Sequence, residues 1–535
     1  MTFSQSWLEN QGAIRGVLVE AFVSISGAAD TPVYLSNIGF MTSDSNISFN
    51  PVIANNVAIS ESISVDGQVS MSFGDIELHN PIGDLDIWLD STYVWVNKPI
   101  KVYVGDPNWT VSNLAALQGG TIFKKVFDGV IEDIDSRSRT SLNIKVRDKL
   151  ERLNNPITET VLGTTGTWSA GQTNKEAIVP LVFGEVFNFE PLLEDPALLR
   201  YRINQGAAEL LIEVRDNGAP LYTHNGSSIT RNSNPVMAVD LTTSRIALTH
   251  PLAGTITISM QGVKNSINLT TGALVTGTYA NNIANLIALI VTQYGSSESG
   301  VRFAAGDLDL PNLAAFQTAN PQPVGIVITD KANTLEVCQQ LARSIGAQVH
   351  MSPEGKLGLV RLGVPTTIGV TFTDPITDAD ILHHTLEVTM RVPVIAATTI
   401  EYNRNYTTQD DLLTLIPTEH KKLFADETTD PAKIVDTSVK STYKLSDTTE
   451  PQESLLIVKS DATAEATRRN NYFKVPRTVY KFTGTSKLLS LVLGQSITVI
   501  HSRFNLYNAG AGRVGQVISL NSNWAKSTVD VEVII

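Results

Sequence analysis

The chain has a single cysteine and few charged residues, and both scarcities limit what it can be. Cys338 is the only cysteine among 535 residues. An intramolecular disulfide and a zinc site built on several cysteines are therefore excluded, and synthesis in a reducing compartment is expected. Charged residues make up 17% of the chain and apolar residues 42%. This balance is typical of ordered, β-rich assembly proteins and not of disordered chains.

A basic excess and long apolar segments are also missing. The formal net charge is −13, and sequence-independent binding to phosphates depends on clustered Lys and Arg, so the composition argues against a protein that grips nucleic acid. The longest apolar run, residues 286–291, is far shorter than the ~20 residues that span a bilayer. Trp7 and Glu9 stand where a signal peptide would place its apolar region, so we expect no secretion signal and a soluble cytoplasmic product.

The chain is too long for one hydrophobic core, since domains hold about 100 to 200 residues each, and three or four domains are expected. Apolar and polar residues alternate over residues 100–104 and again over residues 529–533. Such alternation is typical of strands with one buried face. The sequence therefore predicts a mainly β protein.

Residues 127–156, FDGVIEDIDSRSRTSLNIKVRDKLERLNNP, predict two strands, a turn and a short helix. Apolar residues alternate with polar ones over residues 142–147, so one face is expected to be buried and the other wet. Residues 136–141 are polar turn material. Asp148 and Glu151 are expected to lead a short helix, which the prolyl residue at 156 must end.

Residues 325–365 predict a helix followed by a hairpin. Asn333 and Glu336 can form a capping box at the start of the helix, and Gly346 stands at its expected end. Residues 348–351 and 356–361 flank a turn at 353–355, as the strands of a hairpin would. The residues expected on one apolar face of the helix are Leu335, Cys338, Leu341, Ala342 and Ile345.

Two further helices are expected at residues 281–294 and 461–471, where apolar residues recur at helical spacing or helix formers cluster. Residues 178–191, IVPLVFGEVFNFEP, are expected to form a connector that crosses between domains. Two prolines limit its backbone freedom, and Gly184 permits a bend.

Several of these stretches, taken in order, resemble the tail-tip and baseplate-hub proteins of long-tailed bacteriophages, that is, siphophage tail hubs and the related myophage baseplate hubs. The resemblance covers most of the chain as a pattern of spacing and not as an invariant motif. The stretches that carry it are residues 34–37 (YLSN), 71–91, 102–109, 127–156, 178–191, 325–365 and the closing segment 493–535.

The resemblance implies a mainly β, multi-domain fold with small α/β insertions and two β-barrel hub domains. It implies five parts: a first hub β-barrel domain at residues 1–160, a connector at 161–195, an inserted β-rich domain with one helix at 196–325, a small α/β domain at 326–365 and a second hub β-barrel domain at 366–535.

The resemblance also implies a function. It predicts a structural virion protein, made in the host cytoplasm, that forms a ring-shaped hub at the distal tip of the tail. In a homotrimer, two barrels per chain would give pseudo-sixfold symmetry matching a hexameric tube. The expected partners are the distal tail ring protein, the C-terminus of the tape-measure protein and a central tail fibre or tip protein. Phage DNA would pass without specific binding, and neither an enzyme nor a membrane segment is expected.

The residues that might carry chemistry are better explained structurally. Cys338 falls among the apolar helix positions and is expected in a core. His383 and His384 would point to opposite faces of a strand, which disfavours a shared metal. Residues 84–90 hold three aspartates, but they lack the glycine and terminal glutamate of a calcium loop and are expected to form a solvated turn.

Two other patterns are also better explained by structure than by chemistry. Residues 510–515, GAGRVG, lack the Lys-Ser/Thr of a phosphate-binding loop and are followed by a predicted strand, so they are expected to be a barrel loop. The basic residues within 137–152 interleave with acidic ones, which indicates a solvated face. We therefore predict no catalytic, cofactor-binding or metal-binding residues and no cofactor.

Three alternatives remain open. A hexameric distal tail protein with an inserted domain would have a first barrel of the same pattern. A tail-associated cell-wall hydrolase would need two carboxylates about 5 to 9 Å apart, and none of the 53 acidic residues stands out. A carbohydrate-binding adhesin would need aromatic clusters in its loops, and only 7% of the chain is aromatic.

Overall fold

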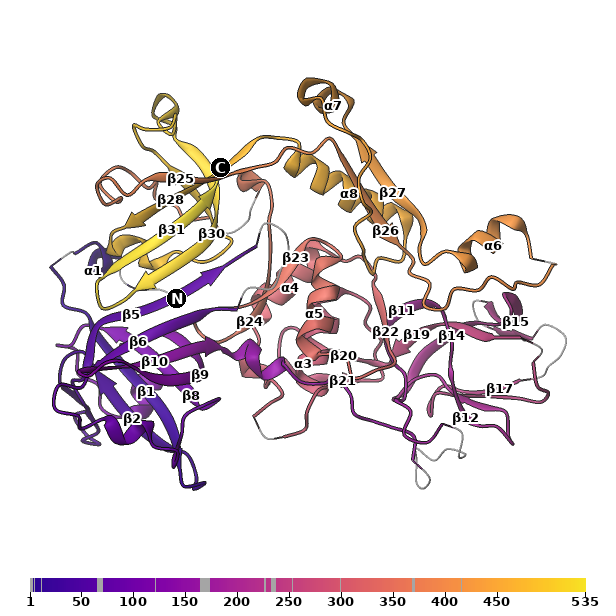
Figure 1. Cartoon of the computed structure of the whole chain (residues 1–535), viewed down its shortest axis with the longest axis horizontal. Helices are drawn as coiled ribbons and strands as arrows, with labels where there is room; N and C mark the ends of the chain where they lie inside the picture. The colour runs from indigo at the N-terminus through magenta and orange to yellow at the C-terminus, as the bar shows by residue number, and fades with distance from the viewer. Residues whose placement is uncertain are drawn as a thin grey trace. The chain divides into compact units, whose positions relative to one another are not determined.

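The computed structural model describes residues 3, 5–10, 12–64, 71–120, 122–163, 174–225, 228–231, 237–252, 254–298, 300–367, 371–414 and 416–535. The protein is mainly β, with several sheets and more than one compact unit, as the sequence predicts (Figure 1). Unit 1 consists of Met1–Glu151, Gln348–Val394 and Pro476–Ile535, and unit 2 consists of Arg152–Ala347 and Ile395–Val475. The finer division into five parts stays a prediction.

The N-terminal strands of unit 1 form an antiparallel array in the order β2-β1-β8-β9-β10-β6-β5. The array contains the hairpin that the sequence predicts, since β9 pairs with β10. The bounds are Gly16–Ile25 for β1, Thr31–Ser36 for β2, Ile53–Ser62 for β5, Phe73–His79 for β6, Pro99–Gly105 for β8, Lys124–Ser138 for β9 and Ser141–Asp148 for β10.

The C-terminal strands continue the same sheet. Their order is β30-β31-β28-β25, with β29 also on β30. Strand β30 pairs with β5, with Ser519 opposite Ser62 and Asn523 opposite Ala58, so the two ends of the chain share one sheet (Figure 1). No closed barrel is found among the described strands, and the two barrels stay a prediction. The bounds are Glu387–Val392 for β25, Arg477–Gly484 for β28, Ser496–Val499 for β29, Arg513–Asn523 for β30 and Thr528–Ile534 for β31.

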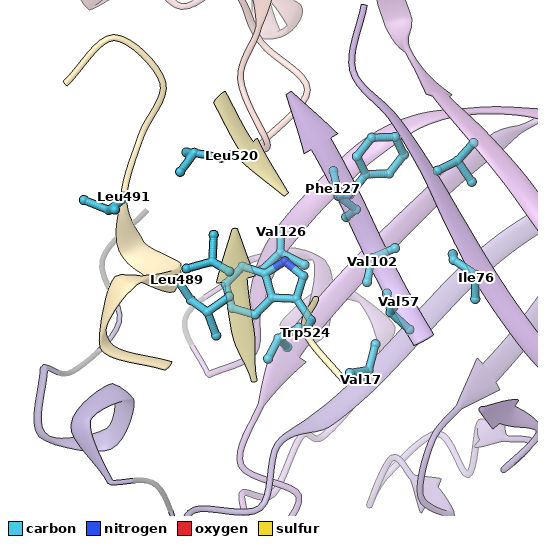
Figure 2. Packing of buried hydrophobic residues seen from close by; sticks show 14 of the residues in the cluster. Val17, Val57, Ile76, Val102, Val126, Phe127, Leu489, Leu491, Leu520 and Trp524 are labelled. Carbon is cyan, nitrogen blue, oxygen red and sulfur yellow. The ribbon is translucent and has the colours of Figure 1, made fainter. Parts of the chain in front are cut away.

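One hydrophobic core serves both strand sets of unit 1. Val17 and Val102 from the N-terminal strands belong to the same cluster of buried side chains as Leu489, Leu520 and Trp524 from the C-terminal segment (Figure 2). Alternate residues of each strand supply this core because successive side chains point to opposite faces of a sheet. The shared core therefore stabilises the joined sheet together with the pairing of β5 and β30.

One detail of the hairpin corrects the sequence-based expectation, and another confirms it. Asn143 is fully buried and not wet, and its amide donates a hydrogen bond of 3.0 Å to Asp75 on β6. The cause is the central position of β10, which β9 and β6 flank on both sides. Asp148 ends the strand and leads the short helix that the sequence predicts, since its carboxylate accepts a hydrogen bond from the backbone N–H of Leu150 inside that helix and another from Ser72. A short 3-10 turn, η2 (Lys149–Leu153), follows.

Unit 2 contains two larger sheets. One has the order β16-β15-β14-β19-β11-β22 and the other the order β12-β13-β18-β17. The bounds of the first sheet are Leu181–Phe189 for β11, Ala208–Asp216 for β14, Ala219–Asn225 for β15, Ser228–Arg231 for β16, Ile256–Val263 for β19 and Gly325–Ile328 for β22. Those of the second are Leu192–Asp195 for β12, Arg200–Arg202 for β13, Met237–Asp240 for β17 and Arg245–Leu248 for β18.

The segment expected to be a connector contributes a strand to the first of these sheets. Strand β11 lies between β19 and β22 and pairs with both. Gly184 has a φ of +67° there, and a Cβ at this position would lie 1.9 Å from the carbonyl oxygen of Val324. Residues 164–173 of the expected connector lie outside the described residues.

All three predicted helices are present in unit 2. They are α3 (Ile283–Gln293), α5 (Thr334–Arg343) and α8 (Lys459–Phe473). Asn333 caps α5 as predicted, since its side-chain oxygen accepts from the N–H groups of Leu335 and Glu336. The hairpin after α5 is also confirmed, as β23 (Ala347–Met351) pairs with β24 (Leu357–Arg361).

Unit 2 also has helices that the sequence reasoning missed, and a further strand pair. The helices are α4 (Leu310–Ala319), α6 (Thr418–Ala425) and α7 (Thr437–Tyr443), and the pair is β26 (Ala397–Tyr402) with β27 (Thr429–Val435). None of the helices in the described part of the chain has the length and hydropathy that a membrane span requires.

Candidate functional site

The lone cysteine lies in a core, as predicted. Cys338 is fully buried on α5, and Leu341 beside it on the same helix is buried as well. Burial raises the pKa of the Cys338 thiol far above its ordinary value, because the thiolate would lose its hydration. A thiol that stays protonated is a poor nucleophile, so this side chain acts as a small hydrophobic group.

The two adjacent histidines do not lie in a strand, which corrects the expectation. His384 has a φ of +66°, a left-handed conformation that a strand cannot contain, and the pair lies in a turn. The two rings are 3.8 Å apart between centroids and meet edge to face instead of pointing apart. Among the described residues, no group of three or more His, Cys, Asp or Glu side chains is placed to hold a metal ion.

The aspartates of residues 84–90 lie in an exposed turn between β6 and β8, as predicted. Asp86 accepts a hydrogen bond of 2.7 Å from the side chain of Asn80. Asp90 accepts one of 2.9 Å from the backbone N–H of Thr92, and this contact holds the pKa of Asp90 below its ordinary value. The contacts organise the turn.

The glycine-rich stretch at 510–515 runs from a short 3-10 turn, η7 (Asn508–Gly510), into β30. A strand and not a helix follows, so the helix N-terminus that a phosphate-binding loop needs is not formed there. Four of the six basic residues of 137–152 form ion pairs with acids, and Lys149 among them is buried, which corrects the expectation of a solvated face at that position. These ion pairs are Arg137 with Asp75, Lys145 with Asp135, Arg147 with Glu132 and Glu151, and Lys149 with Asp128.

Two buried carboxylates near the β5 and β30 pairing were missed by the sequence reasoning. Glu61 on β5 lies opposite Leu520 of β30 and is buried. Burial, and then the nearby charge of Asp148, raises the pKa of Glu61 to about 8. Burial raises the pKa of Asp148 to about 7, although the amides of Ser72 and Leu150 donate to it. The signal was available, because alternation along β5 places Glu61 on the same face as buried Val57 and Ile59.

Unit 2 has two ionic clusters that hold its sheets together. Glu194 is fully buried and contacts Arg200, Arg202 and Arg245, with the Arg202 and Arg245 contacts at 2.8 Å. A buried carboxylate of this kind is tolerated because several guanidinium groups satisfy its oxygens. The contacts join β12, β13 and β18 through side chains as well as backbone.

The second cluster surrounds Arg215 on β14. Its guanidinium carbon lies 5.0 Å from the ring centre of Phe187 and 5.1 Å from that of Phe424, a cation–π arrangement. Its Nη1 donates to Ser259 at 3.0 Å. Phe424 belongs to α6, so the cluster fixes this helix on the sheet of β11 and β14. Neither cluster pairs a nucleophile with a base, and both are structural.

The sheet of unit 1 ends at an edge strand beside a cavity. Five of the six residues of β25 are exposed, including Val388 and Met390, and β28 is its only partner among the described strands. The cavity has a volume of about 410 Å³ and is lined by Ser62, Ile63, Thr389, Met390, Val479, Ile518, Ser519 and Glu532. An exposed edge strand presents unpaired backbone N–H and C=O groups, which suits it to pairing with another chain.

Comparisons with known proteins give structural neighbours only. No protein-family model and no curated protein matches the chain. Among solved structures, the chain is similar to a 43 kDa tail protein of prophage MuSo2 from Shewanella oneidensis, with 11% identity, 96% of this chain and 98% of that chain covered, and a TM-score of 0.37. It is also similar to a tail protein from Neisseria meningitidis MC58, with 9% identity, 97% of each chain covered and a TM-score of 0.38.

A third neighbour belongs to the virion of a native gene transfer agent particle. The identity is 12%, the match covers 72% of this chain and 90% of that chain, and the TM-score is 0.42.

Proposed function

We propose that this chain is a structural virion protein that forms the ring-shaped hub at the distal tip of a long phage tail, as a homotrimer. The observation that carries the proposal is the joined sheet of unit 1, in which N-terminal and C-terminal strand sets lie side by side through β5 and β30. Three copies would present six strand sets, which is the number needed to meet a hexameric tube.

The edges of the joined sheet support an assembly role. Proteins usually protect the edges of a sheet with charge, proline or a covering segment. Strand β25 carries exposed Glu387 and Arg391, but it also exposes the apolar side chains of Val388 and Met390. Edge strands of this kind suit contacts between neighbouring copies in a ring, where each copy covers the edge of the next.

The remaining parts of the proposal follow from the position of such a ring. A hub at the tail tip closes the tube, contacts the distal tail ring protein and the C-terminus of the tape-measure protein, carries a central fibre or tip protein, and lets DNA pass during host entry. The net charge of −13 suits the lining of a passage that must not bind the phosphates of the DNA moving through it. The role is assembly and conduction, not catalysis.

Labelling of intact particles tests this function. Gold-labelled antibodies against the purified chain are expected to decorate the distal tip of the tail and no other part of the particle. Decoration along the tube or at the head would contradict the proposal. Zymography of the purified protein on cell-wall substrate tests the alternative of a hydrolase, and a cleared zone that survives repurification would favour that alternative.

A further inference from the structure

An exposed apolar loop lies between β6 and β8 of unit 1. We call residues 82–96 the acidic loop; it contains the 3-10 turn η1 (Asp86–Leu89) and the short strand β7 (Tyr93–Val94). Ile82 is 81% exposed. The other exposed apolar side chains of this loop are Ile87, Leu89, Val94 and Val96. Large aliphatic groups on a free surface are usually scattered singly, so five of them on one loop of 15 residues make this loop a candidate interaction surface.

The acidic loop is held in shape by its own contacts. Leu85 and Trp95 are buried, and the Nε1 of Trp95 donates a hydrogen bond of 3.0 Å to the carbonyl oxygen of Trp88. The two indole rings lie 5.2 Å apart, and β7 pairs with the end of β1. The outward apolar groups are therefore presented by an ordered loop. Residues 82–96 include Asp84, Asp86 and Asp90 and no Lys or Arg, which gives the loop a charge of −3.

A second exposed loop, between β29 and β30, has the opposite charge. We call residues 501–513 the basic loop; it includes Arg503 and Arg513 and no Asp or Glu. Its exposed apolar side chains are Phe504 and Tyr507, and Tyr507 is 57% exposed. Buried Leu506 anchors it, as Trp95 anchors the acidic loop, and the ring of Phe504 lies 6.0 Å from that of Tyr480 on β28.

The backbone of the basic loop is strained. Phe504 and Ala509 both have a φ of 54°, a left-handed conformation that costs about 1 to 2 kcal/mol for a residue with a Cβ. Strain of this kind persists where a loop must present particular side chains, and it clusters at binding sites. At Phe504 it accompanies an aromatic ring that is 44% exposed.

We propose that the acidic loop of one copy docks against the basic loop of the next copy in the ring. The inference rests on the proposed function, because it takes the partner to be a second copy of this chain. Each loop offers apolar side chains and, among its own residues, charge of one sign, although Asp378 contacts His501 of the basic loop at 3.1 Å. Interfaces are commonly built from an apolar centre and a polar rim. Opposite charges favour this pairing, whereas two acidic or two basic loops repel each other.

The pairing makes a head-to-tail contact. Two different surfaces on one chain, each complementary to the other, join copies in one direction, and such contacts close into a ring when the rotation between copies allows it. The contact therefore explains how identical chains assemble into a ring without a second protein to link them. It also gives both exposed loops the same role.

Cross-linking between single-cysteine variants of the full chain tests the contact. Cys338 is buried, so a bis-maleimide reagent reacts chiefly with an introduced thiol. A mixture of Leu89→Cys and Tyr507→Cys proteins is expected to give a covalent dimer on a denaturing gel, and each variant alone to stay monomeric. A matched control, Leu89→Cys mixed with Glu450→Cys, whose side chain is also exposed, is expected to give at least tenfold less dimer. Cross-linking of either loop variant with itself would overturn the proposal.

A charge exchange provides the second readout. Asp84→Lys and Arg503→Glu are each expected to lower the yield of cross-linked dimer at least fivefold, and the exchange of both charges to restore it. Native mass spectrometry of the same samples separates the two proposals. A ring that assembles as well from the Asp84→Lys or Arg503→Glu variant as from the native chain overturns the contact between the loops and leaves the hub intact. A single copy of the chain in each assembled tail would overturn the proposed hub function itself.

Discussion

At the residue scale, Glu61 is expected to make the stability of the joined sheet of unit 1 depend on pH. Its folded-state pKa of about 8 exceeds its ordinary value of 4.5, chiefly because it is buried. Between these two pH values the native state binds more protons than the unfolded state. The free energy of unfolding therefore falls as pH rises through this window, at up to about 1.4 kcal/mol per pH unit, and the contribution of protonated Glu61 is fully present only below about pH 4.5.

The substitution Glu61→Gln is expected to remove this dependence. The variant should unfold at a higher temperature than the native chain at pH 8 to 9 and gain little at pH 5, since an amide keeps the shape of the protonated acid. Calorimetry of the full chain across this pH range is the measurement. Glu77→Gln on neighbouring β6, whose side chain is half-exposed, is the matched control. A pH dependence unchanged by Glu61→Gln would contradict the assignment.

Leu341 tests the core around α5. Its side chain is fully buried, and Leu341→Ala is expected to destabilise the protein by roughly 2 to 5 kcal/mol through lost burial and a residual cavity. Cys338 on the same helix supplies the probe, because its thiol reacts only when the core opens. The Cys338 thiol should be labelled about 30-fold faster or more in Leu341→Ala than in the native chain, because a loss of about 2 kcal/mol raises the open population by that factor. Glu336→Ala, at an exposed position of α5, should change the rate little. Equal rates in both variants would show that Leu341 is not packed.

At the element scale, the pairing of β11 with β22 depends on two facing glycines. Gly184 lies opposite Gly325 in the register, and a Cβ on Gly184 would lie 1.9 Å from the carbonyl oxygen of Val324. Gly184→Ala is therefore expected to cost about 3 kcal/mol or more, because the strands must move apart. Gly277→Ala is the matched control: its φ is +77°, but its Cβ would meet nothing within 4 Å. It should cost about 1 kcal/mol. Similar urea midpoints for the two variants would contradict the close approach of β11 and β22.

Elements with strong local signals were predictable, and elements defined by distant partners were not. The cap at Asn333 and the apolar positions Leu142, Ile144 and Val146 are set by neighbours in sequence; the cap is present and these side chains are buried. Strand β5 pairs with β30, whose residues lie more than 400 positions away, and nothing local specifies that partner. Helix α6 has charged residues over much of its length, and it is fixed by the contact of Phe424 with Arg215. The exposed apolar side chains of the two loops could not be predicted from the sequence, because exposure is a property of the fold.

At the scale of the whole molecule, the acidic excess predicts how strongly the proposed ring binds DNA. Part of the net charge of −13 is expected to line the passage, where it repels phosphates and leaves no counterion release to hold a duplex. The purified ring should bind duplex DNA at low salt no more tightly than a neutral protein of similar size, as measured by fluorescence anisotropy. A passage rich in Lys and Arg, or binding that weakens steeply with salt, would contradict this prediction.

The central claim is that three copies, each with two strand sets joined in one sheet, form the ring at the tail tip. Electron cryomicroscopy of the assembled particle measures this directly, because copies of a 57.9 kDa chain can be counted around the tail axis. Three copies are expected at the tip, with the N-terminal and C-terminal strand sets of each copy alternating around the passage. Six copies, or three copies with only one strand set facing the passage, would contradict it.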